Sequence, residues 1–156
     1  MRKQEGFSLI ELLIVVTIIL IIAAISVPNL MRSRMSANEA SAVGSVRSIN
    51  SAEAMYQQIN PTVGYTDLAT LGSTAAGNLL DSTLGQASPT KSGYAFTLTL
   101  GSDTPASSYV IGSAPLSSST GTRQFCSDQT FVIRVAGTTF SSTVPTTCAT
   151  TLAALQ

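Results

Sequence analysis

One carboxylate, Glu11, lies inside the most apolar part of the sequence. The stretch from Phe7 to Val27 carries no other charged side chain. A carboxylate in such a segment costs several kcal/mol in a membrane unless it is paired, so it is expected to have a positive partner. The basic side chains nearby all precede the segment, and the cation that the sequence favours is an amine made by cutting the chain. A cut after Gly6, the least hindered residue at this boundary, would place that amine on Phe7.

Two simpler interpretations of this segment stay open. A secretory signal peptide fits the charged start at Arg2 and Lys3, with a small-residue cleavage site near Ser26. The apolar block from Leu12 to Val27 is, however, at the long end for such a peptide, and helix-forming sequence follows it. A plain membrane anchor fits the length, since about 20 apolar residues cross a bilayer. That interpretation leaves the buried carboxylate unexplained.

The segment from Gly6 to Val16, GFSLIELLIVV, resembles the processing and methylation motif of type IV pilins and type II secretion pseudopilins. The resemblance implies that a prepilin peptidase cleaves between Gly6 and Phe7 and methylates the new amine of Phe7. It also implies that Glu11 steers assembly by meeting that amine on a neighbouring subunit. Pro28 lies where many such pilins carry a helix-bending proline. The six-residue leader resembles the short leaders of the type IVa group.

The same resemblance implies the partners and the location of the protein. The partners are other pilin subunits in a homopolymer, the prepilin peptidase, and the inner-membrane assembly platform with its ATPase machinery. Before assembly the chain is expected to cross the inner membrane once, with its N-terminus in the cytoplasm. After assembly it is expected in an extracellular pilus or a periplasmic pseudopilus.

The composition argues against enzymatic and nucleic-acid-binding functions. The 156 residues include no histidine, and 8 basic residues balance 8 acidic ones. Without histidine, Ser-His and Cys-His nucleophiles are excluded, and Lys91 is the only lysine of the polar region. The scattered basic residues form no positive stripe for nucleic acid. No catalytic residue and no cofactor is therefore predicted.

The acidic residues beyond the predicted long helix do not predict a metal site. Asp67, Asp81, Asp103 and Asp128 are far apart and lack the spacing of a calcium loop. We expect them to be solvated or turn aspartates. This weighs against a major pseudopilin, because the resemblance associates those relatives with a calcium site near the C-terminus and with no disulfide there.

Cys126 and Cys148 are the two cysteines, and they lie in a stretch dense in Ser, Thr and Gly. This setting and the export signal favour a disulfide in an oxidising compartment over two reduced, buried thiols. A disulfide-bounded loop near the C-terminus also resembles the variable D-region of type IV pilins. The run from Gly137 to Cys148 is predicted to be mainly loop.

The hydrophobic pattern predicts an α+β fold, the type IV pilin fold that the resemblance also implies. One helix from Phe7 to Ile59 is expected, apolar all round in its first half and amphipathic in its second. The helix is expected to bend or loosen at Pro28, which removes one backbone hydrogen bond. The predicted parts are a leader (1–6), a membrane-spanning assembly half of the helix (7–28), an amphipathic half (29–59), an αβ loop (60–93), and a sheet with the disulfide-bounded C-terminal region (94–156).

A small antiparallel sheet is predicted beneath the amphipathic half of the helix. Tyr94 to Leu100 alternates apolar and polar residues, which is typical of a half-buried strand, and its four large apolar residues should face the helix. Further strands are expected at 109–112 and at 130–136. The 60–93 segment is expected to be a surface connection. The helix stripe expected on the sheet is Val43, Val46, Ile49, Ala52, Met55 or Tyr56, and Ile59.

These observations predict a filament subunit rather than an enzyme. The leading interpretation is a type IV pilin that forms a surface fibre for adhesion, twitching motility or DNA uptake. The alternative within the same architecture is a type II secretion pseudopilin that forms a periplasmic pseudopilus for protein secretion. A monomeric, membrane-anchored binding protein remains as a third interpretation, which predicts no cut at Gly6 and no polymer.

Overall fold

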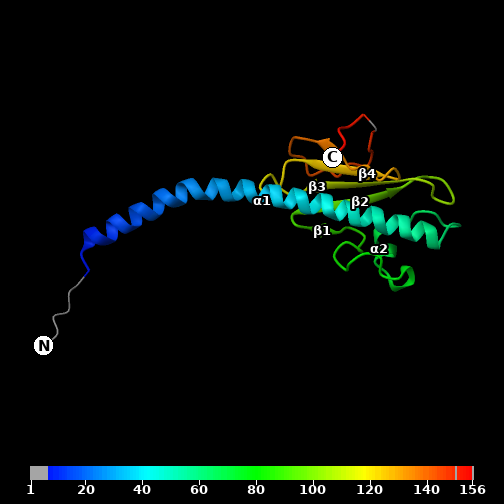
Figure 1. Ribbon diagram of the computed structural model, residues 1–156, viewed down its shortest axis with the longest axis horizontal. Helices are drawn as coiled ribbons and strands as arrows, with labels where there is room; N and C mark the ends of the chain where they lie inside the picture. Colours follow the sequence, from blue (N-terminus) through cyan, green and yellow to red (C-terminus); the bar gives the residue numbers. More distant parts are fainter. Residues whose placement is uncertain (1–6, 150, 156) are drawn as a thin grey trace. The chain divides into compact units, whose positions relative to one another are not determined.

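The computed structural model describes residues 7–149 and 151–155, and it separates into two compact units, residues 1–34 and 35–156. Helix α1 (Leu9–Ile59) contributes its first part to one unit and its second part to the other. Figure 1 shows the second part of α1 beside the sheet strands. The predicted leader, including Gly6, lies outside the described residues.

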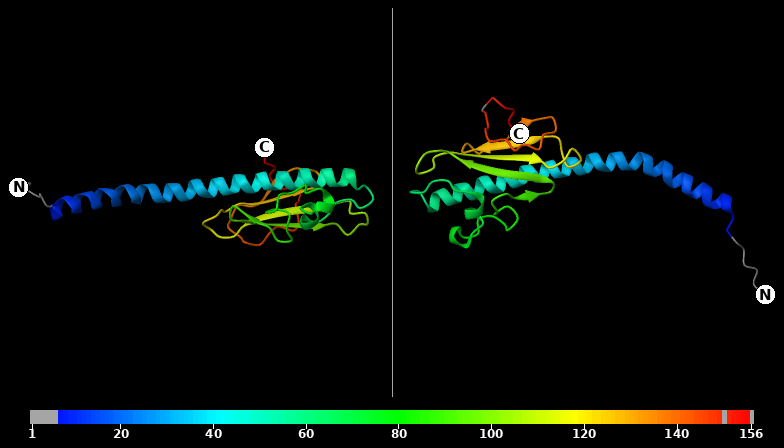
Figure 2. Two further views of the ribbon diagram at one scale, coloured as in Figure 1. Left: turned by 90° about the horizontal axis from the view of Figure 1, so that it is seen from below. Right: turned by 180° about the vertical axis from the view of Figure 1, so that it is seen from behind.

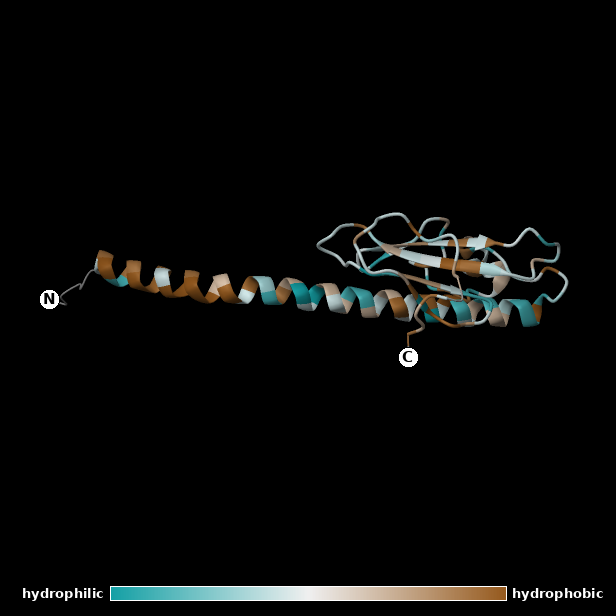
Figure 3. Ribbon diagram, turned by 90° about the horizontal axis from the view of Figure 1, so that it is seen from above, coloured by the Kyte–Doolittle hydropathy of each residue, from teal (hydrophilic) through white to brown (hydrophobic). Residues whose placement is uncertain are grey.

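The first unit consists, among the described residues, of the start of α1. The helix begins at Leu9, two residues later than predicted, and it continues through Pro28 without a break. Its most apolar 18-residue window has a mean hydropathy of 3.0 and none of that window is buried. In Figure 3 most of the ribbon in this part of α1 has the colour of hydrophobic residues. The helix is long and apolar enough to cross a membrane, and the kink at Pro28 stays a prediction.

The second unit is a sheet covered on one face by the later turns of α1 (Figure 2). Five antiparallel strands follow one another in sequence order, as a meander. They are β1 (Thr90–Lys91), β2 (Tyr94–Leu100), β3 (Tyr109–Pro115), β4 (Gln124–Asp128) and β5 (Arg134–Gly137). The predicted α+β class is confirmed.

The core lies between α1 and the sheet. Val46, Ile49 and Ala52 are buried on α1, and they belong to one apolar cluster with Phe96 of β2 and Ile111 of β3. Residues three apart on a helix share a face, which is why this stripe meets the sheet. The predicted contact of the stripe with the sheet is thus confirmed over these three residues.

The predicted core-facing surfaces are wrong only at their far ends, Ile59 of α1 and Leu100 of β2, whereas Val43 packs against the core as predicted. Met55 and Ile59 are exposed, and Tyr56, the predicted alternative to Met55, is partly buried against the core. On β2, Tyr94 and Phe96 are buried as predicted, whereas Leu100 at the far end is exposed. The hydrophobic pattern gives the facing direction of a residue and does not give the length of the surface that covers it.

The 60–93 segment is more than a surface connection. It contains the short helices α2 (Leu68–Leu71) and η1 (Thr74–Ala76), and it contributes Tyr65 and four leucines to the core. Asp67 begins α2, because its carboxylate accepts the backbone N–H of Thr70 at 2.8 Å. The many turn residues of this segment concealed the apolar residues spaced among them.

The last strands differ from the prediction in position. Strand β4 was missed, and the expected strand at 130–136 begins only at Arg134. Phe131 lies in the turn between β4 and β5, with a backbone φ of 62° and an exposed side chain. Ile133 is buried as expected and Val135 is partly buried. The strand predicted at 109–112 is confirmed and extends to Pro115.

Candidate functional site

Glu11, the carboxylate of the apolar segment, makes a hydrogen bond at the start of α1. Oε2 of Glu11 accepts the backbone N–H of Ser8 at 3.0 Å, while the backbone N–H groups of Glu11 and Leu12 donate to the carbonyl oxygen of Ser8. A residue at the third helical position that accepts the N–H of the capping residue is half of a capping box. The carboxylate also lies at the positive end of the helix dipole. Glu11 therefore helps to begin the helix in addition to any role between subunits.

Sequence reasoning missed this role, although a signal for it was present. The four residues Ser8, Leu9, Ile10 and Glu11 form the S-x-x-E pattern that precedes an apolar run at many helix N-termini. The same pattern would have placed the helix start at Leu9 rather than at Phe7. Phe7 precedes the helix, and its side chain is 86% exposed.

The apolar part of α1 has no cover within its own unit. Every large apolar side chain from Leu9 to Ile25 is exposed among the described residues. The hydroxyl of Thr17 donates to the carbonyl oxygen of Leu13 at 2.8 Å, so this polar group is satisfied inside the helix. Such a surface is stable only against lipid or against other apolar surfaces. Glu11 is its one charge.

The second unit ties the amphipathic part of α1 to the sheet through an ion pair. Oε2 of Glu39 lies 2.7 Å from Nε of Arg123, and Oε1 accepts the backbone N–H groups of Thr122 and Arg123. Burial alone raises the pKa of Glu39, but the hydrogen bonds from Thr122 and Arg123 outweigh it and hold the pKa below its usual range. The carboxylate therefore stays ionised where α1 meets the sheet.

A second glutamate of α1, Glu53, is fully buried. Its Oε2 accepts the backbone N–H of Thr66 at 3.2 Å, and its Oε1 has no hydrogen-bond partner in the part of the chain that the structure describes. Burial raises the pKa of this carboxyl to about 8; the Thr66 N–H opposes that change and the nearby charge of Asp67 adds to it. Glu53 is therefore protonated at neutral pH.

A buried chain of hydrogen bonds runs from α1 across the sheet. The hydroxyl of Tyr109 donates to Oδ1 of Asn50, Nδ2 of Asn50 donates to Oγ of Ser127, and Oγ of Ser127 donates to the carbonyl oxygen of Val132. The distances are 2.8, 2.8 and 3.1 Å. Asn50 was not singled out from the sequence, since one polar residue on a helix gives no sign that it faces a sheet. This chain positions the β4–β5 turn over α1.

The two predicted disulfide cysteines are joined. Cys126 lies on β4 and Cys148 in the segment after β5, with their Cα atoms 5.6 Å apart. The disulfide closes a loop that contains β5 and the Thr- and Ser-rich run. Gly112 of β3 pairs with Cys126, and a side chain at position 112 would collide with the carbonyl oxygen of Pro145. The loop therefore lies directly against the sheet.

The four aspartates outside α1 serve local turns, as predicted. Asp67 caps α2, Asp81 accepts two backbone N–H groups and pairs with Lys91 at 3.1 Å, and Asp103 accepts the hydroxyl of Ser107. Asp128 bonds to Thr130 and lies 3.6 Å from Arg134. Each carboxylate is engaged separately, and residues 7–149 and 151–155 contain no group of three or more metal-ligating side chains.

Comparison with known proteins gives matches to part of the chain. The family model for the prokaryotic N-terminal methylation motif matches residues 1–27. Type II secretion system core protein G of Vibrio cholerae is 39% identical over 67 residues, which is 43% of this chain and 46% of that protein. The type IV wide pilus major component PilA4 of Thermus thermophilus is 44% identical over 57 residues, 36% of this chain and 44% of that protein.

Core protein G of Escherichia coli is 38% identical over 58 residues, 37% of this chain and 40% of that protein. The chain thus spans less than half the length of these curated relatives. The relatives include both pilus and secretion-system proteins.

Proposed function

We propose that this chain, which belongs to the family of type IV pilins and type II secretion pseudopilins, is a filament subunit that is cut between Gly6 and Phe7. In this proposal a prepilin peptidase makes the cut and methylates the amine of Phe7. The mature chain is held in the inner membrane by α1 and then passes into a homopolymer. An assembly platform with its ATPase supplies the energy for that transfer.

The observation that carries the proposal is the uncovered apolar surface at the start of α1. A stable monomer in water buries most of its large apolar side chains, whereas this helix exposes all of them from Leu9 to Ile25. Lipid covers such a surface before assembly, and the helices of other subunits cover it afterwards. Both the membrane-inserted state and the assembled state therefore require a helix that is apolar on all sides.

Glu11 supplies direction to this assembly. An ionised carboxylate in hydrocarbon is costly unless a cation pairs with it. In this proposal the cation is the amine of Phe7 on a neighbouring subunit. The hydrogen bond from Ser8 to Oε2 stabilises the helix start and orients the carboxylate. The pairing of Glu11 with that amine sets one subunit against the next along the filament.

Two filament types remain, and a different observation favours each. The disulfide between Cys126 and Cys148, and turn aspartates that gather no cation ligands, favour a surface pilus for adhesion, twitching motility or DNA uptake. Similarity to core protein G favours a periplasmic pseudopilus for protein secretion. The pilus is our first candidate and the pseudopilus our second.

The decisive experiment measures the N-terminus and the location of the native protein. Intact and fragment mass spectra are recorded on material sheared from the surface of the native host. A chain beginning with N-methylated Phe7 in long fibres is the expected result. An uncut chain, or one that starts near Ser26 and is confined to membrane or periplasm, would instead establish an anchored or secreted monomer. Loss of secreted proteins in a deletion strain, with no surface fibres, would identify the pseudopilus.

Variants separate the charge of Glu11 from its role at the helix start. Glu11→Gln keeps an oxygen for the Ser8 N–H and removes the charge, whereas Glu11→Ala removes both. Both variants are expected to insert and to be cut, with filament yield reduced at least tenfold. Thr17→Ala is the matched control, because this hydroxyl bonds only within its own helix. Normal filaments from Glu11→Gln would reject the pairing with the Phe7 amine.

A further inference from the structure

Two arginines follow the apolar part of α1 directly. Residues 12–31 carry no charged side chain, and Arg32 and Arg34 are the first charges after Glu11. Both arginines belong to the first unit, and both are exposed. The ion pairs found in the described part of the chain all involve other cations. The two guanidinium groups are therefore open to a partner outside the chain.

The position of these arginines along the helix places them at the level of lipid headgroups. At 1.5 Å per residue, Arg32 and Arg34 lie about 35 and 38 Å along the axis from Leu9, the first residue of α1. The hydrocarbon core of a bilayer is about 30 Å thick, and the bilayer with its headgroups about 40–45 Å. Side chains on a helix lean back toward its N-terminus, so both guanidinium groups reach back toward the phosphates.

The orientation of the chain in the membrane does not explain arginines at this end of the segment. Basic residues beside a membrane helix usually gather on its cytoplasmic side. In the proposed orientation Arg2 and Lys3 are on that side, whereas Arg32 and Arg34 are on the outer side. Their charge therefore requires a different explanation.

Arg32 and Arg34 also lie on opposite sides of α1. A helix turns by about 100° per residue, so two positions differ by about 200°. A partner protein that packs along one side of the helix would reach one of the two arginines. Lipid surrounds a single membrane helix on every side and offers a phosphate group to both.

A second copy of this chain has few carboxylates to offer these arginines. Three of its carboxylates pair with cations of their own chain, one is buried and protonated, and one caps α2. In the proposed filament Glu11 pairs with the amine of Phe7. Of the carboxylates in the described residues, Asp103 remains, and one group cannot serve two arginines on opposite sides of a helix. The membrane is the better source of the anions.

We propose that Arg32 and Arg34 bind the phosphate groups of anionic phospholipids in the outer leaflet of the inner membrane, and thereby fix the depth of α1 before assembly. This rests on the proposed function, in which α1 crosses that membrane. A guanidinium group donates two parallel hydrogen bonds to phosphate oxygens, and an anionic membrane surface attracts each basic residue beside it. These contacts hold the end of the apolar segment at the headgroups and break when the subunit leaves the membrane.

An introduced tryptophan can measure the lipid contacts at this end of the segment, because the sequence contains none. Val27→Trp places it on the exposed apolar surface about 7.5 Å before Arg32, among the acyl chains. The full-length chain is reconstituted in phosphatidylcholine vesicles, and its fluorescence is quenched by brominated phosphatidylglycerol or by brominated phosphatidylcholine. The phosphatidylglycerol is expected to quench more strongly. Arg32→Gln and Arg34→Gln should each lower this preference about fivefold, and the two together should remove it.

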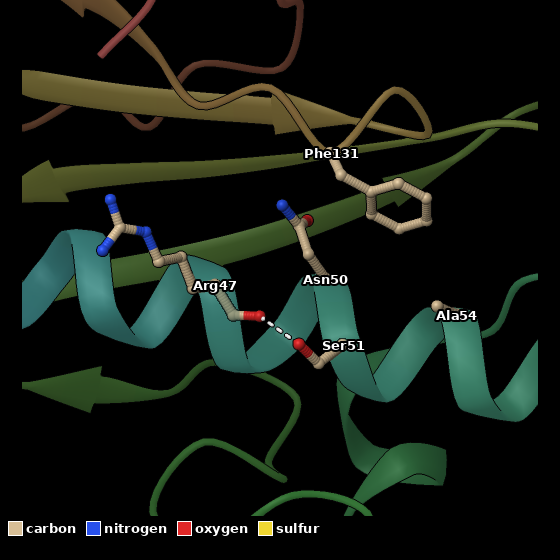
Figure 4. Close-up of a pocket in the computed structure, with 5 residues that line it drawn as sticks. All are labelled: Arg47, Asn50, Ser51, Ala54 and Phe131. Carbon is tan, nitrogen blue, oxygen red and sulfur yellow. Dashed lines mark hydrogen bonds between the residues drawn. The ribbon is translucent and has the colours of Figure 1, made fainter. Parts of the chain in front are cut away.

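Arg47→Gln is the matched control. Arg47 is also exposed on α1 and outside the ion pairs of the described residues, but it belongs to the second unit. The hydrogen bond drawn at this residue in Figure 4 is made by its backbone, whose carbonyl oxygen accepts the hydroxyl of Ser51 at 3.0 Å. This variant should keep the preference of the parent. Lysine at both positions 32 and 34 should keep most of it, because the charge is retained.

The possible outcomes separate the lipid contact from its alternatives. Equal quenching by the two brominated lipids in the parent would overturn the proposal, and so would an unchanged preference in the double Gln variant. A double Gln variant that keeps the lipid preference and loses filaments in the native host would assign the arginines to a protein contact instead. Absence of quenching by either lipid would show that α1 does not enter the membrane and would reject the proposed function itself, so the two failures are distinguishable.

Discussion

Nε of Arg123 lies 2.7 Å from Oε2 of Glu39, and this contact joins α1 to the residue that precedes β4. The side chain of Glu39 is buried and that of Arg123 is about half exposed. The same carboxylate accepts two backbone N–H groups, so removing it leaves donors without their partner. The pair is thus a structural bond between helix and sheet.

Glu39→Gln is expected to destabilise the fold by roughly 1–2 kcal/mol at pH 7. Because the folded-state pKa of Glu39 is lowered, its contribution is present above the unfolded pKa and is lost as pH falls through the folded pKa. The difference between parent and variant should therefore disappear in acid. Thermal unfolding of the full chain in detergent micelles, recorded from pH 7 to 3, measures it.

Asp103→Asn is the control for this measurement, since Asp103 is exposed and accepts one hydroxyl from Ser107. It should change stability by less than about 0.5 kcal/mol. A pH-independent effect of Glu39→Gln would contradict the ionised state assigned to this carboxylate.

The disulfide should stabilise the sheet and hold the Thr- and Ser-rich segment in place. Replacing both Cys126 and Cys148 by Ser is expected to cost about 3 kcal/mol, because the closed loop no longer restricts the unfolded chain. Limited proteolysis should then cut first between residues 138 and 148. Unchanged protease resistance of the double variant would show that packing on β3, and not the disulfide, retains the segment.

The long helix could be predicted from the sequence because two local patterns, one after the other, both indicate a helix. An unbroken apolar run and then the spacing of Val46, Ile49 and Ala52 both indicate helix, and no proline follows Pro28 before Pro61. Strand β2 was equally clear because its alternation extends over seven residues. Signals of this kind are local, and local signals are what a single sequence contains.

The errors arise where structure depends on distant residues. Strand β4 contains Phe125 among short polar residues, and it becomes a strand because β3 and β5 pair with both of its edges. Phe131 fits an alternating strand pattern, yet the hydrogen bonds through Asn50 and Ser127 place it in a turn. Asn50 gave no signal of its own. The position of Phe131 in the β4–β5 turn therefore could not be predicted from the sequence alone.

Gly112 is predicted to be essential for the fit of the disulfide-bounded segment. A methyl group at this position would collide with the carbonyl oxygen of Pro145 and with the side chain of Val144. Gly112→Ala should therefore move the segment away from β3 and destabilise the fold by roughly 1–3 kcal/mol. Hydrogen exchange should increase at residues 141–148, with α1 unaffected.

Gly44→Ala provides the contrast, because a side chain at position 44 meets nothing within 4 Å. Gly44 lies within α1, where alanine is favoured by about 1 kcal/mol, so this variant should be more stable than the parent. If Gly112→Ala matched the parent in stability and exchange, the close approach of Pro145 to β3 would be disproved.

Glu53 is predicted to make the second unit less stable as pH rises. Its folded-state pKa is raised to about 8 by burial, so the folded chain binds more protons than the unfolded chain between the ordinary carboxyl pKa and that value. The free energy of unfolding should decrease across this interval and then level off. The groups that face Glu53 are Thr66, Asp67, Tyr65 and Tyr109, and none of them supplies a positive charge.

Glu53→Gln removes the titration and keeps an oxygen for the backbone N–H of Thr66. Above pH 8 the variant should exceed the parent by up to about 5 kcal/mol, since the pKa of Glu53 is raised from 4.5 to about 8 and each pKa unit corresponds to about 1.4 kcal/mol. Near pH 4 the two should be similar, because both side chains are then neutral. A parent whose stability does not fall between pH 5 and 8, measured by thermal unfolding in micelles beside Glu53→Gln, would mean that Glu53 is ionised or paired in the folded chain.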